Sequence, residues 1–225
     1  MKRAAEADVE REDRTLKSKK ILEHDTDEIA GLLARTAPSL RPFVQEVLYT
    51  EGQIRARAAE MAKIVSNHYS MVFEDGDALI VVGLLNGAIP FMTEFVSHLT
   101  VPTVLDYIGV HSYAGTDTTH TVNFRSDMLQ DPKGKHVLVV DDICDTGTTL
   151  KWCKAHLQKK EPASLLTCVM LDKKERRTAE VEPDWAGWEI PNKFVVGFGL
   201  DFNQKYRDIP FVAVLAPAAY KSSDT

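Results

Sequence analysis

The 225-residue sequence has few cysteines and no apolar run of membrane-spanning length. Its three cysteines, Cys144, Cys153 and Cys168, are odd in number and follow no paired spacing, which argues against a disulfide framework or a zinc knuckle. The N-terminus begins with basic residues but lacks the apolar core of a signal peptide. We therefore expect a cytoplasmic protein with no membrane partner, although these features leave an organellar address open.

The chain also lacks an excess of positive charge, because its 27 Lys and Arg are outnumbered by 33 Asp and Glu. Its formal net charge is -6 and its pI is near 5.7, whereas a sequence-independent nucleic-acid binder needs a basic face that neutralises phosphates. We therefore expect no nucleic-acid partner. Hydrophobic residues make up 44% of the chain, and no long polar linker divides it, so one sizeable core is expected.

The chain reads as one domain with an N-terminal appendage. Residues 1–20 mix acidic and basic side chains with few large apolar ones, which predicts a flexible arm. Residues 21–48 return to a helix-like apolar pattern, interrupted by Pro38 and Pro42, and could form a small cap. We expect a single domain over 21–225.

Strand-like and helix-like patterns alternate through the rest of the chain. Apolar runs of strand length occupy 78–85, 101–110, 136–140 and 164–171. Helical spacing occupies 51–69, 89–99 and 148–159. This alternation implies right-handed crossovers and an α/β fold, with an open, mainly parallel twisted sheet flanked by helices. Residues 111–130 are too polar to be core.

In the stretch VLVVDDICDTGTTL, residues 137–150, an apolar segment of strand character is followed directly by carboxylates and hydroxyls. Ligands of open parallel sheets bind at the carboxyl ends of the strands, where Asp141 and Asp142 are expected. Because side chains alternate along a strand, the two carboxylates should point to opposite sides. One of them could then meet a ribose diol or its Mg²⁺, an ion that prefers oxygen ligands.

After these carboxylates, a helix should begin at the segment Thr146, Gly147, Thr148 and Thr149. The free N–H groups and positive dipole end of a helix N-terminus attract an anion, and a glycine permits close backbone approach. These residues therefore predict a phosphate cradle. The plainer alternative is that Asp145 or Thr146 is an N-cap and that the acidic pair is simply solvated.

The whole string closely resembles the phosphoribosyl-diphosphate signature of type I phosphoribosyltransferases. The resemblance implies that Asp141, Asp142 and residues 146–149 bind ribose and phosphate with Mg²⁺, and that Asp145 is the general base. Further stretches resemble the branch that acts on 6-oxopurines, the hypoxanthine-guanine phosphoribosyltransferases, over residues from about 47 to 215.

GLLNGA, residues 83–88, looks like the diphosphate loop of that branch, which implies binding through Leu85, Asn86 and Gly87. Many members carry Lys where this chain has Asn86. Ser112 and Tyr113 resemble the mobile lid of the family, and some relatives have Arg where Gly109 stands. A lid would shield the reaction centre from water.

The C-terminal segment is similar to the purine-recognition hood of the family. By position, Phe194 would stack on the base, the backbone of Val195 would bind its exocyclic edge, and Lys173 would donate to the 6-oxo oxygen. Asp201 would hold a second Mg²⁺, and Arg207 would bind diphosphate. The hood would comprise about 21–48 and 184–220.

The resemblance implies purine salvage, in which phosphoribosyl diphosphate and a 6-oxopurine give a nucleoside monophosphate and diphosphate. Hypoxanthine and guanine are the expected bases, and the acceptance of xanthine stays open. Homodimers or homotetramers are typical of the family. Two alternatives are a non-catalytic sensor of the sugar diphosphate on the same fold and a related transferase for adenine or pyrimidines.

Overall fold

The computed structural model describes residues 26–112 and 122–219. The expected N-terminal arm, residues 1–20, lies outside the described residues. So does Tyr113 of the expected lid.

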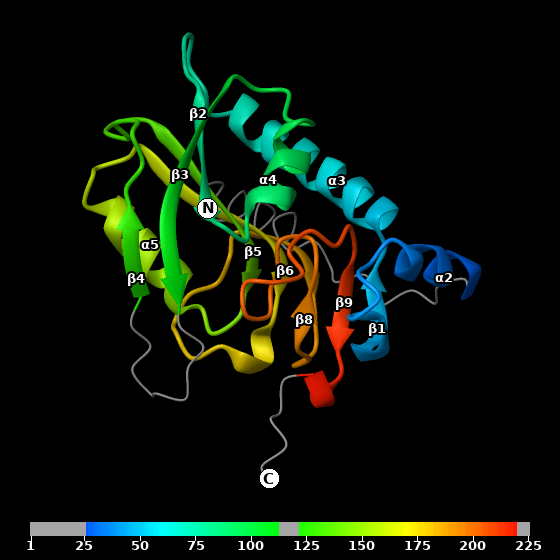
Figure 1. Cartoon of the computed structure of the whole chain (residues 1–225). Helices are drawn as coiled ribbons and strands as arrows, with labels where there is room; N and C mark the ends of the chain where they lie inside the picture. The colour runs from blue at the N-terminus through cyan, green and yellow to red at the C-terminus, as the bar shows by residue number, and fades with distance from the viewer. Residues whose placement is uncertain (1–25, 113–121, 220–225) are drawn as a thin grey trace, which may run out of the picture.

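A six-stranded sheet forms the centre of the molecule, in the order β4-β3-β2-β5-β6-β7 (Figure 1). Its strands are β2 (Leu79–Leu85), β3 (Thr103–Ser112), β4 (Val122–Ser126), β5 (His136–Cys144), β6 (Ser164–Asp172) and β7 (Trp185–Glu189). The pairs from β3 across to β7 are parallel, and only β4 is antiparallel to its neighbour. The expected mainly parallel sheet is confirmed.

Helices cover both faces of this sheet (Figure 1). α3 (Glu51–Ser70) and α4 (Ile89–Val96) lie on one face, where Met61 and Phe91 pack with Val81 of β2. α5 (Thr148–Gln158) lies on the other face, where Leu150 packs with Val82. Strands with both faces covered are apolar almost throughout, which explains the apolar runs 79–85 in β2 and 137–140 in β5.

A smaller three-stranded antiparallel sheet has the order β1-β9-β8. It consists of β1 (Val44–Tyr49), β8 (Val195–Val196) and β9 (Val212–Leu215), next to α2 (Thr26–Ala34). Three single-turn 3-10 helices complete the described secondary structure: Arg41–Phe43, Lys174–Arg176 and Pro217–Ala219. The small sheet has its own apolar core, which includes Leu40 and Phe211.

Two segments differ from the sequence-based expectations. The helix-like pattern of 21–48 was wrong at its end, because 44–49 is a strand that pairs with β9. The range 184–220 expected for the hood includes β7, which belongs to the large sheet through its pairing with β6. Both strands are short, and the partner of β1 is far away in the sequence, so local periodicity did not reveal them. Within the described residues, no helix has both the length and the apolar character needed to cross a bilayer.

Candidate active site

The site is a cavity of about 850 Å³ between the carboxyl ends of the parallel strands and the small sheet. Most of the residues predicted from the sequence line it: Leu85, Asn86, Gly87, Asp141, Asp142, Asp145, Thr146, Gly147, Thr149, Lys173, Phe194, Val195, Asp201 and Arg207. Thr148 is not part of the lining. Ser112 is the last residue of β3, and with Tyr113 outside the described residues the lid stays a prediction.

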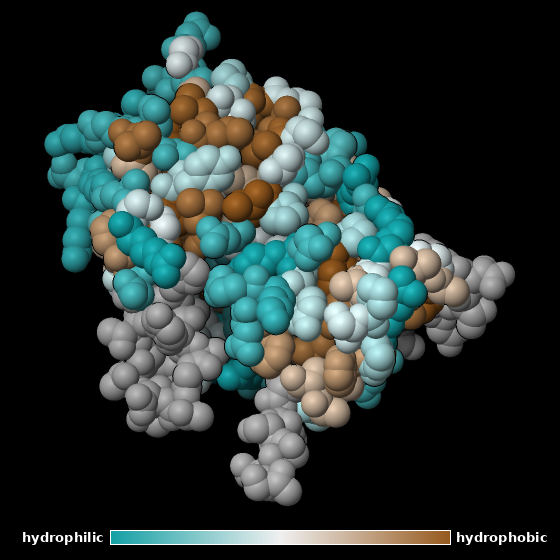
Figure 2. Space-filling model, viewed as in Figure 1, coloured by the Kyte–Doolittle hydropathy of each residue, from teal (hydrophilic) through white to brown (hydrophobic). Residues whose placement is uncertain are grey.

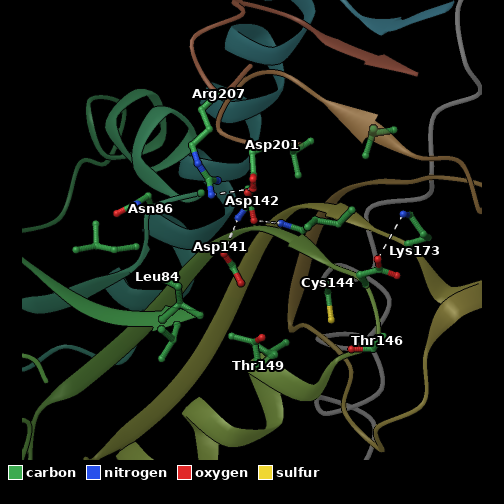
Figure 3. Close-up of a pocket in the computed structure, with 18 of the residues that line it drawn as sticks. Leu84, Asn86, Asp141, Asp142, Cys144, Thr146, Thr149, Lys173, Asp201 and Arg207 are labelled. Atoms are coloured by element: carbon green, nitrogen blue, oxygen red, sulfur yellow. Dashed lines mark hydrogen bonds and ion pairs between the residues drawn. The ribbon is translucent and has the colours of Figure 1, made fainter. Parts of the chain in front are cut away.

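The acidic pair lies within β5, which continues to Cys144 and not only to Val140 as the sequence suggested. Asp141 and Asp142 are both buried. The N–H of Asp142 donates to Asp141 Oδ1 at 2.9 Å, and the N–H of Ile143 donates to Asp142 Oδ1 at 2.8 Å. Figure 3 shows the Asp142 carboxylate facing Asp201 and Arg207, whereas that of Asp141 lies on the side of Thr149.

Burial dominates the electrostatics of this pair. It raises the pKa of Asp141 well above the ordinary value, and the negative charge of Asp142 adds to the effect. Burial also raises the pKa of Asp142, although hydrogen bonds and the positive charge of Arg207 act in the opposite direction. Burial therefore disfavours the charged form of the pair, and a cation or a donor group from a ligand would stabilise it.

The loop after β2 approaches this pair closely. The peptide bond between Leu85 and Asn86 is cis. A Cβ atom on Gly87 would lie 2.0 Å from Asp142 Oδ2, so only glycine permits the observed contact. The loop and the acidic pair thus form one wall of the cavity, with backbone groups where an anion could bind.

The turn from β5 into α5 has the form expected for a phosphate cradle. Gly147 is the N-cap residue, with a left-handed backbone at φ 82°. The Thr148 N–H donates to Thr146 Oγ1 at 3.4 Å, and the Thr146 hydroxyl donates to Thr148 Oγ1 at 3.1 Å. Free N–H groups of the first helical turn and the adjacent hydroxyls can therefore receive an anion.

Asp145 lies next to two basic side chains. Its Oδ2 is 3.5 Å from Lys173 Nζ and accepts a hydrogen bond from Arg176 Nη1 at 3.1 Å. Its Oδ1 is buried and has no hydrogen-bond partner among the described residues. Burial lowers the pKa of Lys173, and the charge of Asp145 opposes that shift. Asp145 therefore keeps one oxygen ready for a donor while the other is held in place.

The small sheet supplies the opposite wall. Phe194 meets Phe202 edge-on, with ring centroids 5.7 Å apart, and Val195 is the first residue of β8. Arg207 Nη2 is 2.7 Å from Asp201 Oδ1, and Arg207 Nη1 donates to the carbonyl oxygen of Gly199 at 2.7 Å. An aromatic face and a fixed arginine thus meet the acidic loop across one cavity.

The residues suit Mg²⁺ better than a metal held by protein alone. No group of three or more His, Cys, Asp or Glu side chains in the described part of the chain could hold a metal. Mg²⁺ usually keeps several waters and binds through one or two carboxylates together with substrate phosphates. The Asp141–Asp142 pair offers carboxylate oxygens in the cavity and fits that mode of binding, and the ion would compensate the charge that burial disfavours.

Sequence reasoning missed several basic residues of the site. Arg125 and Arg176 also line the cavity. Arg177 pairs with Asp172 and donates to the carbonyl oxygen of Cys144 at 3.1 Å, which braces the acidic loop from behind. The run KKERR was a visible signal for Arg176 and Arg177, but nothing in the sequence pointed to Arg125.

Comparison with known proteins agrees with this geometry. Residues 46–203 match the phosphoribosyl transferase domain. The chain therefore belongs to the phosphoribosyl transferase domain family, which confirms the fold class and family expected from the sequence.

Within this family, the chain is similar to enzymes named for hypoxanthine and guanine. It is 41% identical over 168 residues to a hypoxanthine phosphoribosyltransferase of Haemophilus influenzae, covering 74% of this chain and 93% of the relative. It is 36% identical over 180 residues to a hypoxanthine-guanine phosphoribosyltransferase of Mycobacterium avium, covering 79% and 89%. A solved hypoxanthine phosphoribosyltransferase of Staphylococcus aureus has a TM-score of 0.75 and 34% identity, covering 83% of this chain and 100% of that one.

Proposed function

We propose that this protein is a hypoxanthine-guanine phosphoribosyltransferase of purine salvage. It would transfer the phosphoribosyl group of 5-phosphoribosyl 1-diphosphate to hypoxanthine or guanine, with xanthine as a third candidate base. The observation that carries the proposal is that one cavity joins the anion cradle, the Asp145–Lys173 contact and the Phe194 wall. The names of the relatives support an enzyme over a non-catalytic sensor.

In the proposed reaction, an imidazole-ring nitrogen of the purine attacks the anomeric carbon of the sugar. The bond from that carbon to the diphosphate oxygen breaks, and the electron pair leaves with diphosphate. Asp145 takes the proton from nitrogen 7 of the purine. A general base must be within hydrogen-bond reach of the proton that it accepts. The Oδ1 atom of Asp145 supports this role, because it is buried and has no hydrogen-bond partner among the described residues, so it can accept a hydrogen bond from the base.

The purine base would be recognised by the residues of the small sheet, which face the acidic loop across the cavity, together with Lys173. Phe194 would stack on the purine, and the backbone of Val195 would bind the exocyclic edge. Lys173 would donate to the 6-oxo oxygen, which adenine lacks. Because Lys173 is only 4% exposed, its ammonium hydrogen bond would be made in a site of low dielectric constant. We infer a preference for 6-oxopurines over 6-aminopurines.

Binding of the sugar would use the rest of the cavity. Asp141 and Asp142 would bind the ribose, and residues 146–149 would bind its 5-phosphate. Residues 85–87 and Arg207 would bind the diphosphate. Asp141, Asp142 and Asp201 would hold Mg²⁺. When bound, that ion neutralises charge on the leaving diphosphate.

We further propose a homodimer or homotetramer that works in the cytoplasm. An exposed apolar surface supports association with a second copy. Ile89 of α4 is 46% exposed, and Leu105 and Tyr107 on one face of β3 are 45% and 41% exposed. Figure 2 shows apolar side chains over the region of α4 and β3. Sedimentation velocity of wild type and Leu105→Lys would test it, because the charge should favour monomers.

The activity is tested by a spectrophotometric transfer assay with phosphoribosyl diphosphate and Mg²⁺. Hypoxanthine, guanine, xanthine and adenine are offered separately to the wild-type protein. Nucleotide formation from hypoxanthine and guanine, with little from adenine, is expected. Adenine as the best substrate would refute the assigned specificity. No consumption of any base, with the sugar diphosphate still bound, would refute the transferase and favour the sensor.

A further inference from the structure

Arg125 occupies an unusual position in the large sheet. In the pairing of β3 with β4, Gly109 lies opposite Ser126 and Val110 lies opposite Phe124. Arg125 is therefore the extra residue of a β-bulge. Bulges are frequent next to active sites, because they bend a strand and redirect a side chain. The side chain of Arg125 lines the active-site cavity.

The strand that carries Arg125 is held on α5. Phe124 packs against Trp152 and His156, with ring centroids 5.3 Å away in both cases. Asp127 Oδ2 accepts hydrogen bonds from Lys160 Nζ at 2.6 Å and from His156 Nε2 at 3.1 Å. Contacts on both sides of the bulge therefore fix its backbone, although Arg125 itself is exposed.

The charges around the cavity set Arg125 apart from its other basic residues. Lys173 and Arg176 lie next to Asp145, and Arg207 is paired with Asp201. Arg125 has no ion pair with any acidic side chain among residues 26–112 and 122–219. Arg125 is therefore a positively charged residue of the cavity wall that forms no ion pair with a described side chain.

The pairing of Gly109 places Arg125 near the loop after β2. Gly109 pairs with Leu85 of β2, so β3 alone separates that loop from β4. A Cβ atom on Gly109 would lie 2.5 Å from Ser126 Oγ and 3.3 Å from the Cβ of Arg125, so glycine at this position lets the bulged strand lie close against β3. The two strand spacings are on the order of 10 Å, which an arginine side chain and a bound diphosphate can bridge together.

We propose that Arg125 binds the diphosphate group of the sugar substrate and supplies positive charge that the neutral Asn86 of the loop does not. This inference rests on the proposed function. A guanidinium suits this role, because it can form two parallel hydrogen bonds with phosphate oxygens and stays charged at any working pH.

The test compares four proteins: wild type, Arg125→Met, Arg125→Met with Asn86→Lys, and Arg55→Met. Arg55 is an exposed arginine of α3 outside the cavity and is the matched control. Calorimetry measures the affinity for diphosphate in Mg²⁺, and initial rates give KM for the sugar diphosphate and for hypoxanthine. Arg125→Met should weaken diphosphate binding and raise KM for the sugar diphosphate by about 10- to 100-fold.

KM for hypoxanthine should stay within about twofold, and Asn86→Lys should restore most of the lost affinity, because the charge returns to the opposite side of the same group. Unchanged diphosphate affinity in Arg125→Met would overturn the inference. So would an equal loss for hypoxanthine that Asn86→Lys does not restore, since that pattern indicates a structural role. A wild-type protein that transfers to no purine would instead refute the proposed function, and the calorimetric comparison would still decide the role of Arg125.

Discussion

The guanidinium of Arg177 and the carboxylate of Asp172 form an ion pair in which both side chains are buried, 8% and 3% exposed. Arg177 also donates to the carbonyl oxygens of Cys144 and Asp145, each at 3.1 Å. A Cβ atom on Gly147 would lie 2.7 Å from Arg177 Cδ. One side chain therefore ties β6 to the loop that carries the proposed general base and phosphate cradle.

Removal of this arginine should destabilise the protein strongly. Arg177→Met leaves the buried Asp172 without its partner and should lower the free energy of unfolding by about 3–5 kcal/mol, measured by urea denaturation. Adding Asp172→Asn should recover part of the loss. Lys174→Met is the control, because Lys174 and Glu189 form an exposed pair that should contribute less than about 1 kcal/mol. Equal effects of the two single changes would contradict this account.

Gly87→Ala should disable the site while the fold persists. The added methyl would overlap Asp142 Oδ2 and Cγ, at 2.0 and 2.6 Å, and must push the buried carboxylate or the loop out of place. We expect kcat/KM for the sugar diphosphate to fall by at least about tenfold, since catalytic groups tolerate little displacement. Gly52→Ala on α3 is the control, because nothing lies within 4 Å of its added Cβ. Wild-type kinetics in Gly87→Ala would show that the loop can move without cost.

Local sequence determined the acidic loop but not the contacts that complete it. Asp141, Asp142 and Gly147 could be placed because the apolar strand, the carboxylates and the turn are contiguous in the sequence. The contact between Asp145 and Lys173 joins β5 to the end of β6. The family resemblance implied a role for each residue but not this contact, because spacing alone does not reveal contacts between strands.

The sequence did not predict the strands β1, β4 and β7 or the place of Arg125 in the site. Those strands have six residues or fewer, and each is fixed by its neighbours in a sheet and not by its own pattern. The position of Arg125 depends on a one-residue shift in the register of β3 and β4. Register follows from tertiary packing, so a short polar strand does not reveal it in advance.

The cysteines should be unreactive in the native protein. Burial raises the pKa of Cys144 and of Cys153 to about 12, and it raises the pKa of Cys168 as well. The thiolate, which is the reactive form, is therefore scarce at neutral pH. A disulfide reagent should modify no thiol in the folded protein and all three in denaturant. Rapid native labelling of any one of them would contradict the burial described here.

Asp145→Asn should separate catalysis from binding. The amide keeps the shape of the side chain but cannot accept the purine proton, so turnover should fall by about two to four orders of magnitude. Affinity for the sugar diphosphate, measured by calorimetry, should change little. Asp75→Asn, an exposed turn residue, is the control. Unchanged turnover in Asp145→Asn would remove this carboxylate from the mechanism.

The pH dependence should report on Lys173. Burial lowers the pKa of its ammonium group, against the attraction of Asp145 and with a smaller repulsion from Arg176. The donating, protonated form is present below that pKa and is lost as the pH rises through it. With hypoxanthine, kcat/KM should therefore fall on the alkaline side at a lower pH than an ordinary lysine would allow.

Lys173→Arg tests this assignment, because a guanidinium stays protonated throughout the range and should move the alkaline limb to higher pH. Lys174→Arg is the matched control. The hydrogen bond from Lys174 to Glu189 raises the pKa of Lys174, and that residue does not line the cavity. It should leave the profile unchanged. An alkaline limb that persists unshifted in Lys173→Arg would show that another group titrates there, and it would separate Lys173 from recognition of the 6-oxo oxygen.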